Sequence, residues 1–160
     1  MNRRACCFAP GSIICRLDSK EKYAAIHELI EKAPVFKHLS DRGAFEKSVI
    51  AREESQSTGY GKGVAFAHGR TADVDTLFIS LGISKQGIPF DSVDGKPVHL
   101  LFIIANNPCR KIEYLRALSI LAELVRDETF RERLIQGSRT EELEDMLGEA
   151  FRSNWAERTA

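Results

Sequence analysis

Long apolar runs, a net charge and paired cysteines are all missing from this 160-residue sequence. No stretch approaches the roughly 20 apolar residues that cross a bilayer, which excludes a membrane-embedded protein. The 23 Lys and Arg residues balance the 23 Asp and Glu residues, so no strong field draws the chain to nucleic acid or to anionic lipid. We therefore expect no nucleic-acid partner and no direct membrane insertion.

The few cysteines do not form a metal-binding or disulfide pattern. Cys6, Cys7 and Cys15 lie near the N-terminus and Cys109 is far away, without CxxC spacing. Two arginines precede a short apolar patch, but a Pro-Gly pair interrupts it, so a continuous export segment is missing. We expect a reduced, cytoplasmic protein that holds no metal ion and no cofactor.

The apolar residues that are present recur with two different periods. Helical spacing predicts helices over residues 20–32, 41–55, 112–126, 128–135 and 140–151. Short β-branched or apolar runs predict strands over residues 12–17, 64–67, 76–83 and 98–105. Asp18, three residues before Glu21, resembles a capping box, and Asp41 is a candidate cap for the second helix.

Strands flanked by helices indicate a layered α/β domain, with no repeat or linker that would divide it. The apolar run from Val98 to Ala105 has the composition of a central strand that is covered on both faces. We expect a flexible N-terminal segment at residues 1–11, one domain at residues 12–153 and a C-terminal tail at residues 154–160.

The most informative segment, residues 55–70, reads SQSTGYGKGVAFAHGR. Three glycines precede the apolar run from Val64 to Ala67, which delivers His68 to its end, facing a cleft. A histidine that accepts a phosphoryl group must be neutral, must be oriented by a hydrogen bond, and needs cations or amides around the incoming oxygens. A hydrogen-bonded structural histidine would fit the same position.

The neighbours of His68 offer each of these groups. Ser57 and Thr58 carry hydroxyls, the backbone from Gly59 to Gly63 carries N–H donors, and Arg52 or Arg70 carries a fork matched to phosphate. Taken singly, the glycines also fit an ordinary loop, and Arg52 also fits a solvated helix face.

The segment STGYGKGVAFAHGR resembles the signature of the enzyme IIA domains of the bacterial phosphoenolpyruvate-dependent sugar phosphotransferase system, in their fructose, mannitol and nitrogen-regulatory class. Members of that class read close to STGIGNGVAIPHGR. The similarity continues in SLGISKQGIPFDSVDGKPVHLLFIIANNP and in residues 118–124, so it covers about residues 13–151. The single-domain length and the phrase IPFDSVDGKPVHLLF look most like the stand-alone nitrogen-regulatory members.

This resemblance implies a mixed β-sheet flanked by helices, in a phosphohistidine carrier rather than a stand-alone enzyme. His68 would accept a phosphoryl group from a histidine-containing phosphocarrier protein, and Arg52 matches the family's arginine before the glycine loop. Regulatory targets such as a sensor kinase or a potassium transporter would then read the phosphorylation state.

Two positions depart from the family pattern. Ala67 replaces a proline that fixes φ just before the histidine, and Tyr114 stands where the family has a second histidine. A tyrosine hydroxyl can donate a hydrogen bond to phosphate, but it does not share a proton near neutrality as imidazole does. Two alternatives therefore stay open: a phosphotransfer-impaired binding module of the same fold, or a sugar-specific IIA component of a multi-subunit permease.

The remaining candidates have simpler interpretations. His27 and His38 fit structural or solvated roles. His99 could approach the cleft from its strand, but packing within the sheet explains it as well. Cys109 follows Pro108 near a helix start, but no resolving cysteine or base is identifiable nearby, so we do not expect redox chemistry there.

Overall fold

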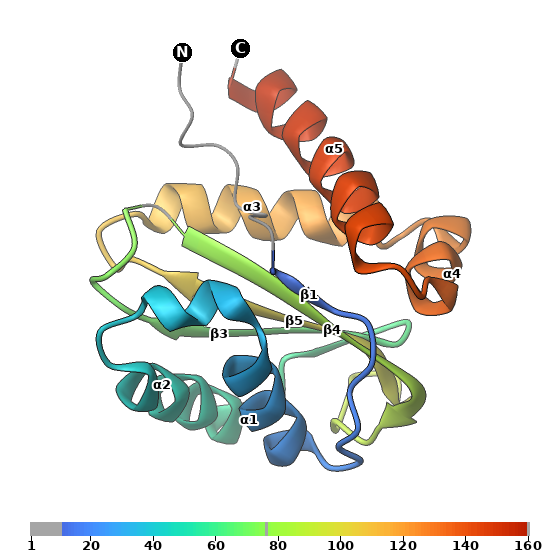
Figure 1. The fold of residues 1–160 in the computed structure, drawn as a ribbon, viewed down its shortest axis with the longest axis horizontal. Helices are drawn as coiled ribbons and strands as arrows, with labels where there is room; N and C mark the ends of the chain where they lie inside the picture. Colours follow the sequence, from blue (N-terminus) through green and yellow to red (C-terminus); the bar gives the residue numbers. More distant parts are fainter. Residues whose placement is uncertain (1–10, 76, 160) are drawn as a thin grey trace.

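The computed structural model describes residues 11–75 and 77–159, and it is built around a five-stranded mixed sheet with the order β1-β4-β5-β3-β2 (Figure 1). Its strands are β1 (Ile13–Ile14), β2 (Gly59–Gly61), β3 (Val64–Arg70), β4 (Leu77–Ile88) and β5 (Val98–Asn106). The central strand β5 runs parallel to β3 and antiparallel to β4, and residues 100–105 are buried. The predicted central, doubly covered strand is therefore confirmed.

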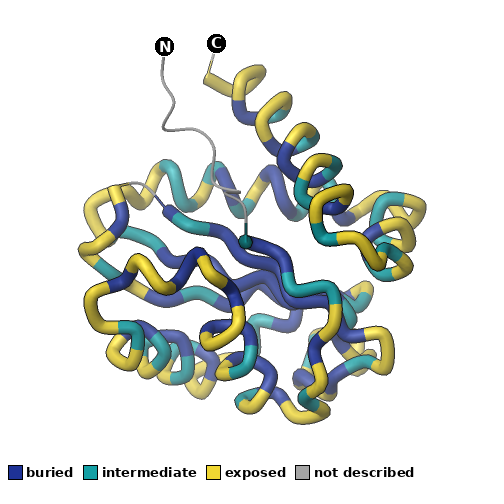
Figure 2. The backbone as a smooth tube through the Cα atoms, viewed as in Figure 1, coloured by how far each residue is buried: buried dark blue, intermediate teal, exposed yellow. Residues whose placement is uncertain are grey.

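Helices cover both faces of the sheet, as the sequence predicts (Figures 1 and 2). One face carries α1 (Lys22–Lys32), the 3₁₀ helix η2 (Pro34–His38) and α2 (Arg42–Ser55). The other face carries α3 (Lys111–Leu124), α4 (Glu128–Gln136) and α5 (Thr140–Thr159). Each face has its own apolar core, so the described residues form the α/β sandwich that the resemblance implied.

Side-chain alternation along β3 decides which core each of its residues enters. Val64 and Phe66 lie in the core beneath α3, whereas Ala65 and Ala67 lie in the core beneath α2. By the same period of two, His68 falls on the α3 face. The strand also continues through Arg70, so His68 lies inside β3, paired with β5, and not at its end as the sequence analysis expected.

Of the two predicted helix caps, one is confirmed and one is not. Asp18 does not cap α1; the N-cap is Glu21, whose carboxylate accepts hydrogen bonds from the amides of Tyr23 and Ala24. The reason is that Asp18 lies outside the helix, where its own amide donates to Glu28. Asp41 does cap α2, with its carboxylate accepting from the Ala44 amide at 2.9 Å.

The last helix continues well past residue 151, where the sequence analysis ended it. Trp155 is 7% exposed and stacks on Phe151 at 5.7 Å between ring centroids, and the Arg116 guanidinium lies 5.3 Å from the Trp155 ring centroid. Arg158 forms an ion pair with Glu123 of α3. These contacts dock residues 154–159 onto α3 as helix. Cys6 and Cys7 lie outside the described residues.

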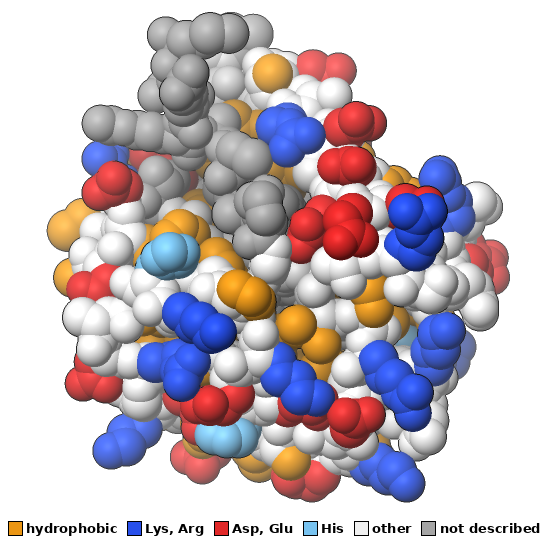
Figure 3. Space-filling view, viewed as in Figure 1, with side chains coloured by type: hydrophobic (Ala, Val, Ile, Leu, Met, Phe, Trp, Pro, Cys, Tyr) orange, Lys and Arg blue, Asp and Glu red, His pale blue; other side chains and the backbone are white. Residues whose placement is uncertain are grey.

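The surface is mixed in charge, in keeping with the balanced composition. On the side seen in Figure 3, Lys and Arg side chains are interspersed with Asp and Glu over most of the visible face. None of the helices in the described ranges combines the length and the apolar character needed to cross a bilayer.

Candidate functional site

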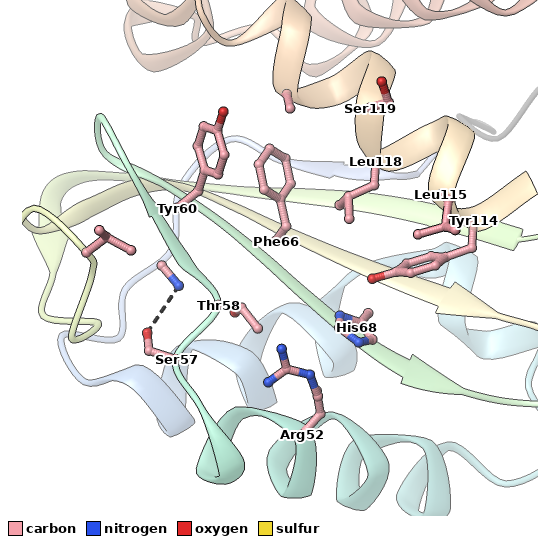
Figure 4. A pocket seen from close by; sticks show the side chains of 13 residues that line it. Arg52, Ser57, Thr58, Tyr60, Phe66, His68, Tyr114, Leu115, Leu118 and Ser119 are labelled. Atoms are coloured by element: carbon pink, nitrogen blue, oxygen red, sulfur yellow. Dashed lines mark hydrogen bonds between the residues drawn. The ribbon is translucent and has the colours of Figure 1, made fainter. Parts of the chain in front are cut away.

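An open cavity of about 670 Å³ lies between the α3 face of β3, the helix α3 and the short strand β2. His68 and Phe66 enter it from β3, Tyr114 and Leu118 from α3, and Arg52 from the last turn of α2 (Figure 4). The cavity therefore joins His68, Arg52 and Tyr114, which the sequence analysis singled out from three separate segments.

His68 is held in its neutral form. Burial lowers the pKa of its imidazole first, and the positive charge of Arg52 lowers it further, while the Phe66 carbonyl and Glu53 act in the opposite direction. The side chain is only partly buried, but its Nδ1 atom is shielded from solvent. A molecule in the cavity can therefore reach the imidazole only through Nε2.

Arg52 supplies an uncompensated positive charge beside that imidazole. Its Nη1 donates to the Gln56 carbonyl at 2.8 Å, which ties the guanidinium to the end of α2. Among the described residues no carboxylate lies within ion-pair distance of it. Arg52 and His68 also line a second cavity, of about 360 Å³, together with Arg70 at the end of β3. The charge of Arg70 lowers the pKa of His68 as well, behind burial and Arg52.

Tyr114 faces His68 across the cavity, with 5.2 Å between ring centroids and planes inclined by 50°. Burial raises the pKa of its phenol, an effect that Arg52 partly opposes, so the hydroxyl keeps its proton at neutral pH and is a hydrogen-bond donor. The hydroxyl points into the cavity (Figure 4). Ala67, the other departure from the family pattern, is buried within β3 opposite Ile103 of β5.

The glycine-rich segment forms a tight pair of strands rather than an open anion cradle. Lys62 and Gly63 both have positive φ, which turns β2 sharply into β3. A Cβ atom at Gly59 would lie 2.7 Å from the Cα of Ser92, so this position requires glycine. The amides of Gly59 and Lys62 are already bound, to Ser57 and Asp94.

The two hydroxyls expected near the phosphate also donate elsewhere. Ser57 donates to the Phe90 carbonyl at 2.5 Å, and Thr58 donates to the Glu53 carboxylate. Both residues line the cavity. Their hydroxyl protons are already used in hydrogen bonds within the protein, which stabilise this wall of the cavity. Arg52, Arg70 and Tyr114 are therefore the groups free to meet an anion at His68.

Sequence reasoning missed two features of this site. One is Glu53, whose side chain is fully buried and pairs with Lys22 of α1 at 3.1 Å. Its spacing gave a signal: Phe45, Val49 and Glu53 follow one another at intervals of four, which places the carboxylate on the buried stripe of α2. The other is an apolar rim, defined here as the exposed side chains of Tyr60, Val93, Ile112 and Leu115.

The other histidines and the two described cysteines lie elsewhere. His27 pairs with Glu46 at 2.8 Å, and His99 donates from Nδ1 to the Ser84 carbonyl at 2.8 Å. Cys109 is exposed before α3, and Cys15 contacts the Thr140 hydroxyl. None of the four lines the cavity that holds His68.

Comparison with known proteins connects this geometry to a family. Residues 7–150 match the model of the phosphoenolpyruvate-dependent sugar phosphotransferase system, EIIA 2. A nitrogen regulatory protein of Klebsiella oxytoca is 34% identical over 140 residues, covering 86% of this chain and 85% of the relative. The fructose-specific EIIABC component of Bacillus subtilis is also 34% identical, over 138 residues and 86% of this chain, but the chain spans only 22% of that protein.

The fold agrees with these sequence matches. The crystal structure of nitrogen regulatory protein IIA-Ntr from Neisseria meningitidis superposes with a TM-score of 0.77 at 31% identity, covering 86% of this chain and 93% of the other. Family model, relatives and fold all point the same way: this chain belongs to the EIIA 2 family of the phosphoenolpyruvate-dependent sugar phosphotransferase system.

Proposed function

We propose that the protein is a cytoplasmic phosphocarrier that accepts a phosphoryl group on Nε2 of His68. The observation that carries this proposal is a neutral, half-buried imidazole beside the unpaired Arg52 in an open cavity. A neutral imidazole keeps a lone pair for attack, which a protonated one lacks. The donor is a phosphohistidine of a histidine-containing phosphocarrier protein. Its P–N bond breaks as the new P–N bond forms at His68, and the donor ring keeps the electron pair.

In such a transfer the protein accelerates the reaction mainly by positioning the reacting groups and by stabilising charge, because the reaction needs little covalent participation from other side chains. Arg52 and Arg70 stabilise the negative charge on the transferred oxygens from the α2 side of His68. Tyr114 donates a hydrogen bond to the transferred phosphoryl group from the α3 side, because its phenol stays protonated. Ser57, Thr58 and Gly59 support the reaction indirectly, as the wall that keeps the cavity in shape.

The apolar rim gives the donor a surface on which to dock. Val93 is 88% exposed, and with Tyr60 and Leu115 it lines the cavity that holds His68. Ile112, which is 70% exposed, lies three residues before Leu115 on α3. Exposed apolar groups next to a reactive group favour a transient protein partner with an apolar face of its own. Phosphorylation adds negative charge inside this rim, so the same surface would distinguish partners by phosphorylation state.

The similarity to nitrogen regulatory proteins supports a regulatory role for the phosphorylated protein. These relatives are close to this chain in length. The proposed targets are proteins such as a sensor kinase or a transporter, which bind one phosphorylation state of His68 better than the other. The similarity to a fructose-specific component favours a second candidate, a sugar-specific IIA that passes the group to a IIB partner.

Intact-protein mass spectrometry tests the transfer. The protein is incubated with phosphoenolpyruvate, enzyme I and a phosphocarrier protein, and we expect one phosphoryl mass that His68→Ala abolishes and that the matched variants His27→Ala and His99→Ala retain. Labelling that survives His68→Ala would overturn the assignment. Loss of the label on adding a IIB partner and its sugar would favour sugar transport over regulation.

The same assay addresses the phosphotransfer-impaired module. If Tyr114 cannot do the work of the family's second histidine, the native chain labels slowly and Tyr114→His labels much faster. Equal rates would mean that the tyrosine hydroxyl is an adequate substitute.

A further inference from the structure

Glu53 occupies an unusual position next to the site. Its carboxylate is fully buried in the last turn of α2, one residue after Arg52, and it pairs with Lys22, whose side chain is only 10% exposed. A buried charge is costly unless it is paired and hydrogen-bonded, so this arrangement persists only if all of its partners stay in place. The proposed transfer step uses neither residue.

The carboxylate also binds the wall of the His68 cavity directly. Both of its oxygens accept from the Thr58 amide, at 3.0 and 3.2 Å, and one accepts from the Thr58 hydroxyl. These bonds close the turn between the end of α2 and β2. Arg52 and Thr58 both line the cavity. Glu53 is adjacent to Arg52 in the chain and bonded to Thr58, so it fixes the distance between these two lining residues.

Lys22 extends the same network to the opposite loop. Its Nζ donates to Asp91 at 3.2 Å and lies 5.0 Å from the Phe90 ring centroid. The Phe90 carbonyl accepts from Ser57, and the Val93 amide donates to the Gly59 carbonyl. The loop that carries Val93 of the apolar rim is therefore tied, through Lys22, to the same carboxylate.

We infer that Glu53, held by Lys22, is the positioning residue that fixes two parts of the cavity around His68. These are the Arg52 side chain and the wall formed by Ser57, Thr58 and Gly59. Helical geometry gives the reason: consecutive side chains are about 100° apart, so burying Glu53 beneath Thr58 sets the direction in which Arg52 points. The inference rests on the proposed phosphotransfer, because its consequence is a rate. Glu53 itself touches no reacting atom.

Glu53→Gln tests the inference, with Glu54→Gln as the matched control on the exposed side of the same helix turn. Glutamine presents one acceptor oxygen instead of two, so the hold on Thr58 weakens. We expect the rate of His68 phosphorylation to fall by about 10–100-fold in Glu53→Gln, the range for a catalytic group misplaced by about 1 Å. Glu54→Gln should label at the native rate.

A second measurement separates positioning of Arg52 from the loss of one charge. The charge of Arg52 lowers the pKa of His68, so Arg52→Gln raises that pKa in an NMR titration of the native protein. If Glu53 fixes Arg52, the same Arg52→Gln change raises the His68 pKa by less in a Glu53→Gln protein, because the guanidinium has already moved. An equal rise in both proteins would overturn the inference.

The double variant Lys22→Met with Glu53→Gln covers the case in which a single variant does not fold, because exchanging a whole buried ion pair is often tolerated. We expect it to fold and still to label slowly. A folded single or double variant that labels at the native rate would overturn the inference. If the native chain itself does not label, the proposed function fails instead, and the effect of Arg52→Gln on the His68 pKa in the two proteins still reports whether Glu53 holds Arg52.

Discussion

Gly69 lies directly after His68 and provides a sharp test of how α2 is held against β3. A Cβ atom there would lie 2.6 Å from Val49 Cγ2 and 2.9 Å from Phe45 Cε2, on the inner face of α2. Ordinary carbon contacts are about 3.5–4.0 Å, so Gly69→Ala forces the helix away from the sheet by about 1 Å. Overpacking of this kind costs about 1–3 kcal/mol, which corresponds to a Tm lower by about 2–12 °C.

The displacement matters for function because α2 carries Arg52. We expect Gly69→Ala to label His68 about 10–100-fold more slowly while still binding the phosphocarrier. Thermal unfolding and the mass-spectrometric time course measure the two effects. Gly43→Ala is the control, because its added methyl group would lie 3.6 Å from its nearest neighbour on the same helix. Removing the obstruction with Val49→Ala should return part of the rate to the Gly69→Ala protein.

Unchanged stability and an unchanged rate in Gly69→Ala would refute this reasoning. That combined result would mean that α2 does not rest on β3 at Gly69 as closely as the two distances state. A lower Tm with an unchanged rate would instead mean that α2 can shift without displacing the Arg52 guanidinium from His68.

Three further predictions concern charge and packing. Arg52→Gln removes the positive charge that lowers the His68 pKa, so that pKa should rise in an NMR titration; an unchanged value would mean that burial alone sets it. Burial raises the pKa of Glu28, but hydrogen bonds from Lys32 and from the Asp18 and Ser19 amides outweigh it and bring the pKa to about 2. Because that value is below the ordinary 4.5, Glu28 contributes stability above about pH 4.5, roughly 3 kcal/mol at pH 7, and the contribution disappears as the pH falls toward 2. Urea titrations of the native protein and Glu28→Gln should therefore diverge at pH 7 and converge near pH 2, and a constant difference would contradict the assignment. Trp155→Ala should cost about 3–5 kcal/mol in the same assay, since Trp155 anchors the end of α5 in the core; a cost below about 1 kcal/mol would mean that residues 154–159 are not docked.

The sequence was sufficient for the features that depend on local periodicity. The apolar run at residues 98–105 predicted a covered central strand because parallel pairing buries both faces. The cap of α2 by Asp41 was also predictable, because a carboxylate just before a helix accepts hydrogen bonds from the free amides of its first turn. His68, Arg52 and Tyr114 were found as candidates, and the fold brings them to one cavity.

Features that depend on distant partners were not readable in the same way. Ser57 and Thr58 looked like phosphate donors, but the partners that claim their protons, Phe90 and Glu53, are decided by tertiary packing. Asp18 and Glu21 fit the spacing of a capping box, yet the helix begins one turn later than that motif requires. The buried pair of Lys22 and Glu53 links residues 31 positions apart, beyond the reach of any local pattern.

The apolar rim has a consequence for how this protein can diversify. Val93 and Ile112 are largely exposed, so replacing either costs little stability, typically within about 0.5 kcal/mol. The groups proposed to react, in contrast, come from β3, from the last turn of α2 and from the first turn of α3. A duplicated copy of the chain can therefore acquire a new docking specificity by drift at the rim, while the proposed nucleophile and cations are inherited unchanged.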